Sequence, residues 1–346
     1  MNLDALTDKN ILIYGANGYT GRLMARTCKE YGLSPILAGR SDAVAKAAID
    51  LDLDYTVFEV HEAKKELSEI DFLINTAGPF RATQGPLMDA CIETSTHYID
   101  VCGKWKEVDR AIERDQMARE AGVVLLPSAG FGIAPPDIAA QIALSTIEEP
   151  ESAFTVAATY GKVSRGTLFS MLSEINEVGT VWRKGADVPA HPAEEAVEIE
   201  LFGTKVKGVN NPLRADLRTV PHATKVPNYQ SFMKLPNFAI GMMNGKLGWL
   251  RKLILSKLHW LPEGPNEKQL KSGHTLVYAE ARNQQGNICR VHLKGPEAYL
   301  FSVDCVLLAI NKIVRESAHS GFCTPSLLIG EEIGSIKGAV LRLFND

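Results

Sequence analysis

Several patterns that would point to a common function are missing from this sequence. The six cysteines form no CxxC pair, and no HExxH or other cluster of His and acidic residues occurs, so we predict neither a metal site nor a disulfide framework. The sequence also lacks a nucleophile elbow with partners in Ser-His-Asp order, which leaves hydrolysis without support. No apolar stretch is long enough to cross a bilayer, and the N-terminus has no signal-peptide pattern, so we expect a cytoplasmic protein.

An excess of charge of one sign is also missing. The formal net charge is −4 over 346 residues, and Lys and Arg form no long run. Contacts with phosphate backbones need clustered Lys and Arg, so nucleic acid is not expected as a partner. Hydrophobic residues make up 45% and charged residues 23%, which is typical of a globular chain, here long enough for two domains.

A glycine loop near the N-terminus is the most informative feature that is present. An apolar run at 11–14 leads into three glycines spaced three apart, and a helical pattern follows. The first glycine permits a tight turn, the second lets the backbone approach a pyrophosphate, and the third lets the helix pack close to the strand. We predict that the pyrophosphate of a dinucleotide is held by Gly15, Asn17, Gly18, Tyr19, Thr20, Gly21 and Arg22.

The end of the second apolar run indicates which dinucleotide binds. The run 35–38 is followed by Gly39-Arg40-Ser41, at the place where NAD-binding chains carry an acidic residue for the ribose hydroxyls. A guanidinium there would attract a 2′-phosphate, so Arg40 and Ser41 favour NADP over NAD. The alternative is that Arg40 is an ordinary surface residue and that Asp42 reaches the ribose.

Strand-like and helical patterns alternate over residues 10–127. We expect strands at 11–14, 35–38, 55–60, 71–75, 97–101 and 122–126. We expect helices at 20–31, 42–50, 62–68, 85–94 and 105–121. This alternation predicts an α/β fold, with an N-terminal Rossmann domain over 1–127 that contains a doubly wound parallel sheet.

The rest of the chain has longer strands with clearer alternation, at 154–160, near 195–208, at 275–280 and near 288–294. They predict an inserted α/β domain with a mixed or antiparallel sheet over 128–320. A helix near 304–317 stops at Gly321, and Thr324-Pro325 marks the start of another helix. We therefore expect residues 321–346 to form a C-terminal helix that returns to the Rossmann domain.

The turn after the fourth expected strand is a further candidate for cofactor contact. Dinucleotides cross the carboxyl ends of parallel strands at the topological switch point, so this turn would lie against the cofactor. An ordinary strand–helix loop is the alternative. The residues concerned are Asn75, Thr76, Ala77, Gly78, Pro79 and Phe80.

The strand 97–101 carries the candidate catalytic residues. Tyr98 and Asp100 share one face, with Tyr98 a candidate proton donor and Asp100 a candidate orienting group. That Asp100 instead caps a nearby backbone turn is equally compatible with the pattern. Lys104 could bind an acidic substrate group or be a solvated residue at a helix start, and His97 is expected to be structural or solvated and not catalytic.

Three later segments leave alternatives open. The Gly- and Pro-rich stretch 128–137 could be a hinge close to the nicotinamide, with Asp137 at a helix start. The stretch 164–170 could bind an anion, or Ser164 or Thr167 could cap a helix there. Residues 246–260 form a basic amphipathic pattern that suits an anionic membrane or a lipid-like substrate, although we favour packing on its own sheet or at a dimer interface.

Taken in order, these segments resemble the saccharopine dehydrogenase-like oxidoreductases, which include saccharopine reductases and trans-acting enoyl reductases. The resemblance implies an NADP-binding Rossmann domain, an inserted substrate or dimerisation domain and a closing C-terminal helix. Lys104 stands where family members often have Glu, and Gly132 where they commonly have Asp. The segments that carry the resemblance are 15–22, 38–40, 75–80, 97–103, 130–132, 164–167 and 321–325.

The leading hypothesis is an NADP(H)-dependent oxidoreductase. It would move a hydride to or from a C=N or activated C=C bond of a small or lipid-like substrate. The two missing acidic groups motivate the alternative of a non-catalytic NADP(H)-binding sensor or scaffold, peripheral to a membrane through 246–260. Formation of a homodimer is left open.

Overall fold

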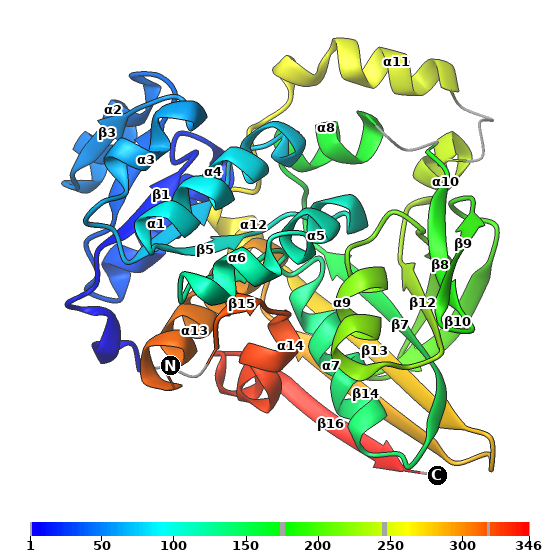
Figure 1. Cartoon of the computed structure of the whole chain (residues 1–346). Coiled ribbons are helices and arrows are strands. Elements are labelled where there is room, and N and C mark those ends of the chain that lie inside the picture. Colours follow the sequence, from blue (N-terminus) through cyan, green and yellow to red (C-terminus); the bar gives the residue numbers. More distant parts are fainter. Residues whose placement is uncertain (1, 174–176, 244–247, 317–318, 346) are drawn as a thin grey trace. The chain divides into compact units, whose positions relative to one another are not determined.

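The computed structural model describes residues 2–173, 177–243, 248–316 and 319–345, and these fall into two compact units (Figure 1). The first unit contains Met1–Phe131 and Tyr299–Ile329, and the second contains Gly132–Ala298 and Gly330–Asp346. This division differs from the predicted one at the C-terminal side. The long helix before Gly321 groups with the first unit, and the residues after Ile329 group with the second.

The first unit is built on a seven-stranded sheet in the order β15-β6-β5-β4-β1-β2-β3, in which all neighbouring strands are parallel. The chain runs outward from β1 to β3 and then returns to the other side of β1 at β4. The carboxyl ends of β1 and β4 therefore form the switch point of a doubly wound sheet, as predicted. The strands are β1 Ile11–Tyr14, β2 Ile36–Gly39, β3 Tyr55–Val57, β4 Phe72–Asn75, β5 His97–Asp100, β6 Val124–Leu126 and β15 Gly321–Phe322.

The helices of this unit follow the predicted order, with two differences. The helix expected at 85–94 already begins at Phe80, and the one expected at 105–121 is split in two. All residues of β1 and β4 are buried, which explains why both strands are continuous apolar runs. The helices are α1 Tyr19–Glu30, α2 Ala43–Leu51, α3 Ala63–Glu66, α4 Phe80–Thr94, α5 Trp105–Ile112, α6 Asp115–Glu120, α13 Ala298–Glu316 and α14 Pro325–Leu328, with short 3-10 turns at Asp4–Leu6 and Val60–Glu62.

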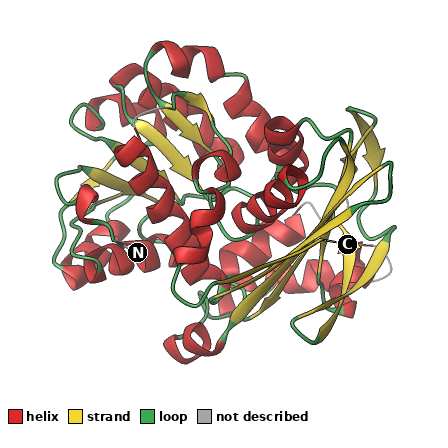
Figure 2. Ribbon diagram, turned by 90° about the horizontal axis from the view of Figure 1, so that it is seen from below, coloured by secondary structure: helices red, strands yellow, loops and turns green. Residues whose placement is uncertain are grey.

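The second unit contains a nine-stranded sheet, in which seven strands follow the order β10-β11-β12-β7-β13-β14-β16 and β8 and β9 branch from β12. Strands β7 and β12 are parallel and the other pairs are antiparallel, so the sheet is mixed, as predicted. Figure 2 shows these long strands in yellow. They are β7 Pro150–Tyr160, β8 Gly179–Arg183, β9 Ala186–Ala190, β10 Ala196–Leu201, β11 Thr204–Asn210, β12 Asn228–Met233, β13 His274–Asn283, β14 Ile288–Gly295 and β16 Val340–Asn345.

Two groups of helices accompany this sheet. The buried helix α7, Ala134–Ser145, packs on β7, β13 and β14, and α9, Asp216–Thr224, packs on α7 and β12. The other group is α8 Arg165–Ser173, α10 Asn237–Met243 and α11 Gly248–Ser256, joined through an apolar cluster around Leu172 and Met242. A 3-10 turn at Leu258–Trp260 and α12, Glu267–Ser272, complete the unit before β13.

The C-terminal segment differs from the expectation for 321–346. Thr324 does cap a helix, since its side chain accepts a hydrogen bond from the backbone N–H of Leu327, but that helix ends at Leu328. A 3-10 segment at Gly330–Ser335 and strand β16 follow, and β16 pairs with β14 at the edge of the second sheet. Among the described residues, no helix is both long and apolar enough to cross a membrane.

Candidate functional site

The glycine loop between β1 and α1 is held by backbone hydrogen bonds. The N–H groups of Gly15 and Ala16 donate to the carbonyl of Ala38 in β2, at 2.8 and 3.1 Å, and the N–H of Gly18 donates to the carbonyl of Gly15 at 2.9 Å. Gly15 has a φ of +85°, a conformation that side chains other than glycine rarely adopt. Backbone hydrogen bonds and the left-handed conformation of Gly15 therefore set the turn of the loop.

Two of the glycines are required because neighbouring chain segments lie too close for a side chain. A Cβ atom at Gly15 would lie 2.7 Å from the backbone nitrogen of Ala77, in the turn after β4. A Cβ atom at Gly21 would lie 2.6 Å from the carbonyl oxygen of Gly15 and 2.7 Å from the Cα of Ala16. The turns after β1 and β4 thus touch at the switch point, and the surface between them consists mainly of backbone.

The start of α1 suits an anion. Gly18 is its N-cap and has no side chain to satisfy the first N–H groups, and the first turn contains no acidic residue. The partial positive charge of the helix N-terminus adds to the attraction for an anion. Asn17 and Gly18 are exposed, and Tyr19 and Thr20 are half-buried. Backbone donors in a glycine cradle at a switch point are the arrangement that holds a dinucleotide pyrophosphate, so the residues present fit this cofactor.

Two of the predicted phosphate-binding side chains support the loop. The Arg22 guanidinium donates to the carbonyl oxygen of Asn17, with Nη1 at 2.6 Å. The Tyr19 ring packs edge-on against Tyr299 in α13, with ring centroids 5.0 Å apart. These contacts hold the exposed backbone of the loop in place, a role that the spacing of the sequence does not reveal.

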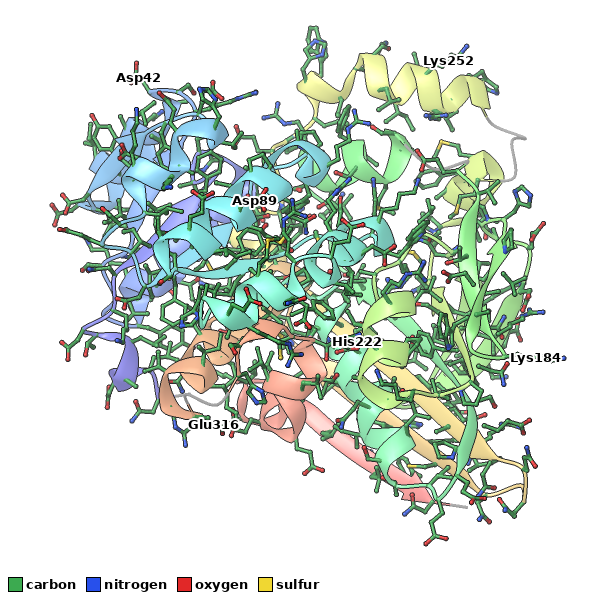
Figure 3. The ribbon with its side chains drawn as sticks, viewed as in Figure 1. Asp42, Asp89, Lys184, His222, Lys252 and Glu316 are labelled. Atoms are coloured by element: carbon green, nitrogen blue, oxygen red, sulfur yellow. The ribbon has the colours of Figure 1, made fainter. Side chains whose placement is uncertain are left out.

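Arg40 lies immediately after β2 and is exposed. Within the described ranges its guanidinium forms no hydrogen bond or ion pair. Burial and the nearby Glu59 raise the pKa of Tyr14, at the end of β1, and Arg40 opposes this rise, which shows that its charge acts close to the switch point. Asp42, the N-cap residue of α2, is exposed and makes no capping bond, and Figure 3 shows its side chain pointing outward. Ser41 is exposed as well.

The turn after β4 is held by hydrogen bonds of side chains in and next to it. Asn75 accepts a hydrogen bond from the N–H of Ala77 at 3.0 Å and donates to the hydroxyl of Tyr98 at 2.9 Å. Thr76 donates to the carbonyl of Tyr14 at 2.9 Å, and Thr83 donates to the carbonyl of Ala77 at 2.7 Å. Gly78 and Pro79 are exposed and Phe80, which starts α4, is half-buried. The turn is thus a shaped surface beside the glycine loop.

Asp100 organises a buried hydrogen-bond network at the end of β5. Its Oδ1 accepts from the backbone N–H groups of Cys102 at 2.9 Å and Ser128 at 2.8 Å. Its Oδ2 accepts from the hydroxyl of Tyr98 at 2.8 Å and from Nε2 of Gln84 at 2.9 Å. The network joins the loops after β5 and β6 to α4. Asp100 therefore caps backbone turns, which is one of the two alternatives that the sequence left open.

The prediction that Tyr98 donates a proton to substrate does not agree with this arrangement. Its side chain is fully buried, its hydroxyl proton is donated to Asp100, and the hydroxyl oxygen accepts from Asn75. Burial and the nearby Asp100 raise the pKa of Tyr98 well above its usual value. Tyr98 and Asp100 are placed to position the loops, and neither reaches solvent.

Lys104 is the N-cap residue of α5, and it is half-buried. The backbone N–H groups of Gly103 and Lys104 both donate to the carboxylate of Glu107, at 3.2 Å. Burial and the nearby Asp100 raise the pKa of Glu107, and Lys104 opposes this rise. Lys104 thus lies at a helix start, as one of the two alternatives from the sequence has it. Its ammonium group lies close to the end of β5.

The structural alternatives for two other residues agree with their contacts. His97 accepts a hydrogen bond from the N–H of Val124 through Nδ1 at 3.0 Å, and burial lowers its pKa, which is a structural role. Ser164 accepts from the N–H of Thr167 at 3.1 Å and so caps α8, while Arg165 pairs with Glu263 at 3.1 Å. The segment 164–170 is therefore a capped helix start whose arginine already has an anionic partner.

The second unit contains polar clusters that the sequence analysis missed. Asp216 accepts from Arg214, Tyr229 and Ser231 in a buried network, and Glu280 binds Arg282 and Arg290 on β13 and β14. Asp216 lies in α9 and its donors Tyr229 and Ser231 lie in β12, so only the alternation of polar residues within the strand could have signalled that network.

A third cluster lies where β7 and β12 end. The ammonium of Lys234 lies 3.7 Å from the centroid of the Tyr160 ring, and that ring stacks on His274 at 4.6 Å. Burial, Lys294 and Lys234 lower the pKa of His274. The hydroxyl oxygen of Tyr160 is buried without a hydrogen-bond partner among the described residues. The Lys234 cation thus lies over the Tyr160 ring, whose other contact is with His274.

The comparison with known proteins agrees with this geometry. The family model described as the saccharopine dehydrogenase NADP binding domain matches residues 11–126, which is the glycine loop and the strands up to β6. Residues 11–126 of the first unit are thus similar to a saccharopine dehydrogenase NADP binding domain. The predicted resemblance and the predicted cofactor, NADP, are thereby confirmed.

Relatives of this NADP-binding chain extend the similarity beyond the domain. A saccharopine dehydrogenase-like oxidoreductase of Mus musculus is 23% identical over 362 residues, which cover 84% of each chain. A trans-acting enoyl reductase of Mycobacterium tuberculosis is 25% identical over 48% of this chain and 44% of its own. A lipid droplet localized protein of Caenorhabditis elegans is 23% identical over 37% of this chain and 34% of its own. The matches support an oxidoreductase of the saccharopine dehydrogenase-like kind.

The glycine cradle gives a first testable prediction. Gly15→Ala adds a Cβ against Ala77 in a left-handed conformation, so it is expected to weaken NADPH binding tenfold or more and to destabilise the first unit by about 2–4 kcal/mol. The matched control is Gly122→Ala, which has the same kind of backbone, a φ of +68°, but no described heavy atom within 4 Å of the new Cβ. Calorimetric NADPH titration and thermal unfolding measure both effects. NADPH binding of wild-type strength by Gly15→Ala would contradict the cradle.

Proposed function

We propose that this NADP-binding protein is an oxidoreductase that transfers a hydride to or from a C=N or activated C=C bond. NADPH supplies the hydride in the reducing direction, the hydride adds to the carbon, and a proton completes the nitrogen or the second carbon. The observation that carries the proposal is the backbone cradle at the switch point, where the turns after β1 and β4 approach so closely that only glycine fits at Gly15.

The choice of NADP rests further on Arg40. Its guanidinium is exposed, follows β2 directly and has no partner in the described part of the chain. In the proposed complex it binds the 2′-phosphate together with Ser41, and the N-terminus of α1 binds the pyrophosphate. Gly78, Pro79 and Phe80 would lie against the nicotinamide ribose, since their turn touches the glycine loop.

The three predicted catalytic residues take different roles in this proposal. Tyr98 and Asp100 are positioning residues, because their buried network fixes the turns after β4, β5 and β6. Lys104 is the one of the three whose side chain is not fully buried, and we assign it the binding of an acidic substrate group. The Lys234–Tyr160–His274 cluster of the second unit offers another place for such a group. The proton donor is not assigned.

The names of relatives guide the proposal for the substrate. One is named as an enoyl reductase and another as a lipid droplet protein, which favours an activated C=C bond in a lipid-like molecule over a small imine. The cytoplasmic location and the homodimer remain predictions.

The alternative function is a sensor that binds NADP(H) without turnover. Screening imine and enoyl substrates while NADPH absorbance is followed distinguishes it from the oxidoreductase. Tight NADPH binding with persistent inactivity across both classes favours the sensor.

Titration with the two cofactors tests the proposal directly. NADPH is expected to bind roughly 10- to 100-fold more tightly than NADH, because one or two charge-assisted hydrogen bonds to the 2′-phosphate are lost with NADH. Nicotinamide fluorescence measures both affinities. Raised salt should reduce the difference between the NADPH and NADH affinities, because the contact between Arg40 and the 2′-phosphate is exposed. Equal affinity for the two cofactors would refute the role of Arg40, and binding of neither would refute the oxidoreductase.

A further inference from the structure

The helix α11 and the turn after it present large apolar side chains to solvent. Trp249 is 66% exposed, Leu253 43%, Trp260 80% and Leu261 42%, and we call these four residues the tryptophan patch. Tryptophan is highly buried on average in folded proteins, and the chain has only four of them. Two of the four thus lie in one exposed segment, which calls for an explanation.

The other side of the same helix is already used within the second unit. Leu250, Ile254 and Leu255 pack against the apolar cluster of α8 and α10 that includes Leu172 and Met242. The helix therefore packs on α8 and α10 of its own unit, whereas the favoured sequence alternative was its own sheet or a dimer interface. Lys246 and Leu247, which belong to the basic amphipathic pattern, lie outside the described residues.

Helical spacing places two of the exposed apolar side chains together, and the other two follow in the turn after α11. Trp249 and Leu253 are four residues apart and lie on one face of α11, with Lys252 beside them and Lys257 just beyond the end of the helix. Figure 3 shows Lys252 on α11 with its side chain pointing away from α8. The Arg251 guanidinium, in contrast, donates to the carbonyl of Ser173 and anchors the helix.

The charge of this region is one-sided although the whole chain is acidic. No Asp or Glu occurs between Asp216 and Glu263, whereas the formal net charge of the chain is −4. Lys252, Lys257 and His259 are exposed beside the tryptophan patch. Segments that lie in the headgroup region of anionic bilayers have this composition, which combines exposed tryptophans with flanking cations and lacks acidic residues.

We propose that the tryptophan patch, with Lys252 and Lys257, docks the protein on an anionic membrane surface. The tryptophan rings enter the headgroup region and the lysines bind the negatively charged lipids. A second copy of the chain is a poorer occupant, because a symmetric interface would bring the same cations against each other. The inference does not depend on the proposed oxidoreductase activity, since the patch is remote in sequence from the NADP-binding residues.

Vesicle sedimentation tests the docking surface. The full-length protein is mixed with vesicles of phosphatidylcholine alone or with added phosphatidylserine, and the bound fraction is measured at low and high salt. We expect binding to the phosphatidylserine vesicles that weakens with salt. Trp249→Ser with Trp260→Ser, and separately Lys252→Glu with Lys257→Glu, should each lower the partition coefficient tenfold or more.

Matched controls separate the patch from general effects. Ile49→Ser removes another apolar side chain, 74% exposed, and Lys184→Glu reverses an exposed lysine of the β8–β9 turn, and both should bind vesicles like the wild type. NADPH titration of every variant reports on the fold. Wild-type protein that stays in the supernatant with phosphatidylserine vesicles would overturn the proposal. Patch variants that bind the vesicles as well as the wild type would also overturn it. So would patch variants whose only change is conversion of a dimer to a monomer in sedimentation velocity, since the patch would then be a dimer interface.

Discussion

Asp100→Ala is expected to lower the free energy of unfolding of the first unit by about 3–5 kcal/mol, the largest effect predicted for any single side chain here. The substitution removes the acceptor for four buried donors, which are the N–H groups of Cys102 and Ser128, the Tyr98 hydroxyl and the Gln84 amide. Because all four groups are buried, the substitution leaves each of these donors without this acceptor. Chemical denaturation with NADPH absent measures the loss.

Graded variants separate this explanation from a general sensitivity to mutation. Asp100→Asn keeps the shape and one acceptor oxygen, so its effect should be smaller than that of alanine. Asp89→Ala removes another aspartate of the same unit, paired with Arg114 at 2.6 Å but half-exposed, and should cost about 1 kcal/mol or less. Equal losses for Asp89→Ala and Asp100→Ala would contradict the network.

Tyr98→Phe decides between positioning and catalysis. The variant removes a hydroxyl that bonds Asn75 and Asp100, so a stability loss of about 1–2 kcal/mol with modest loss of turnover is the expected result. A variant that binds NADPH normally and is as stable as the wild type, yet has lost turnover, would restore Tyr98 as the proton donor.

Arg40→Asp has the largest expected effect on cofactor choice. It replaces a cation beside the 2′-phosphate by an anion, so NADPH affinity should fall about 100-fold or more while NADH affinity is kept or improved. Because Arg40 is exposed and forms no ion pair in the described ranges, the stability of the fold should not change. Titration of both cofactors gives the ratio of affinities.

The control for Arg40 changes the same amount of charge at a different place. Lys65→Asp alters an exposed lysine of α3 in the same unit and should leave the preference for NADPH intact. If Lys65→Asp weakens NADPH binding as much as Arg40→Asp does, the effect is one of overall charge and the specific contact is refuted.

The sequence was most informative where a single stretch of chain determines the structure. Strands β1 and β4 of the first sheet are buried throughout and so appear as apolar runs, and the glycine loop is short enough for its spacing to reveal the turn. In the second sheet, β9 was missed because its residues are mostly exposed, and the short strand β8 was missed although it is partly buried. Strand β16 was expected to be helical because the capping signal at Thr324 marks the start of a helix but not its length.

The candidate site was predictable in its backbone but not in its side-chain contacts. Three glycines and Arg40 could be assigned from their places at strand ends. The partners of Asp100 could not, because Gln84 and Ser128 lie 16 and 28 residues away and meet it only through the sheet. A buried Tyr-Asp pair looks the same in sequence whether it faces a substrate or the interior.

Both compact units are discontinuous along the chain, and this constrains how the protein is made. A ribosome completes β1 to β6 early, but α13 and β15 of the same sheet emerge only after the intervening residues 132–298. The second sheet in turn lacks its edge strand β16 until synthesis has passed residue 345. Neither unit can reach its final form by folding strictly in the order of translation. The part of the first unit that packs against α13 and the edge of β14 therefore remain without their final partners during synthesis, which is when assistance by a chaperone matters most.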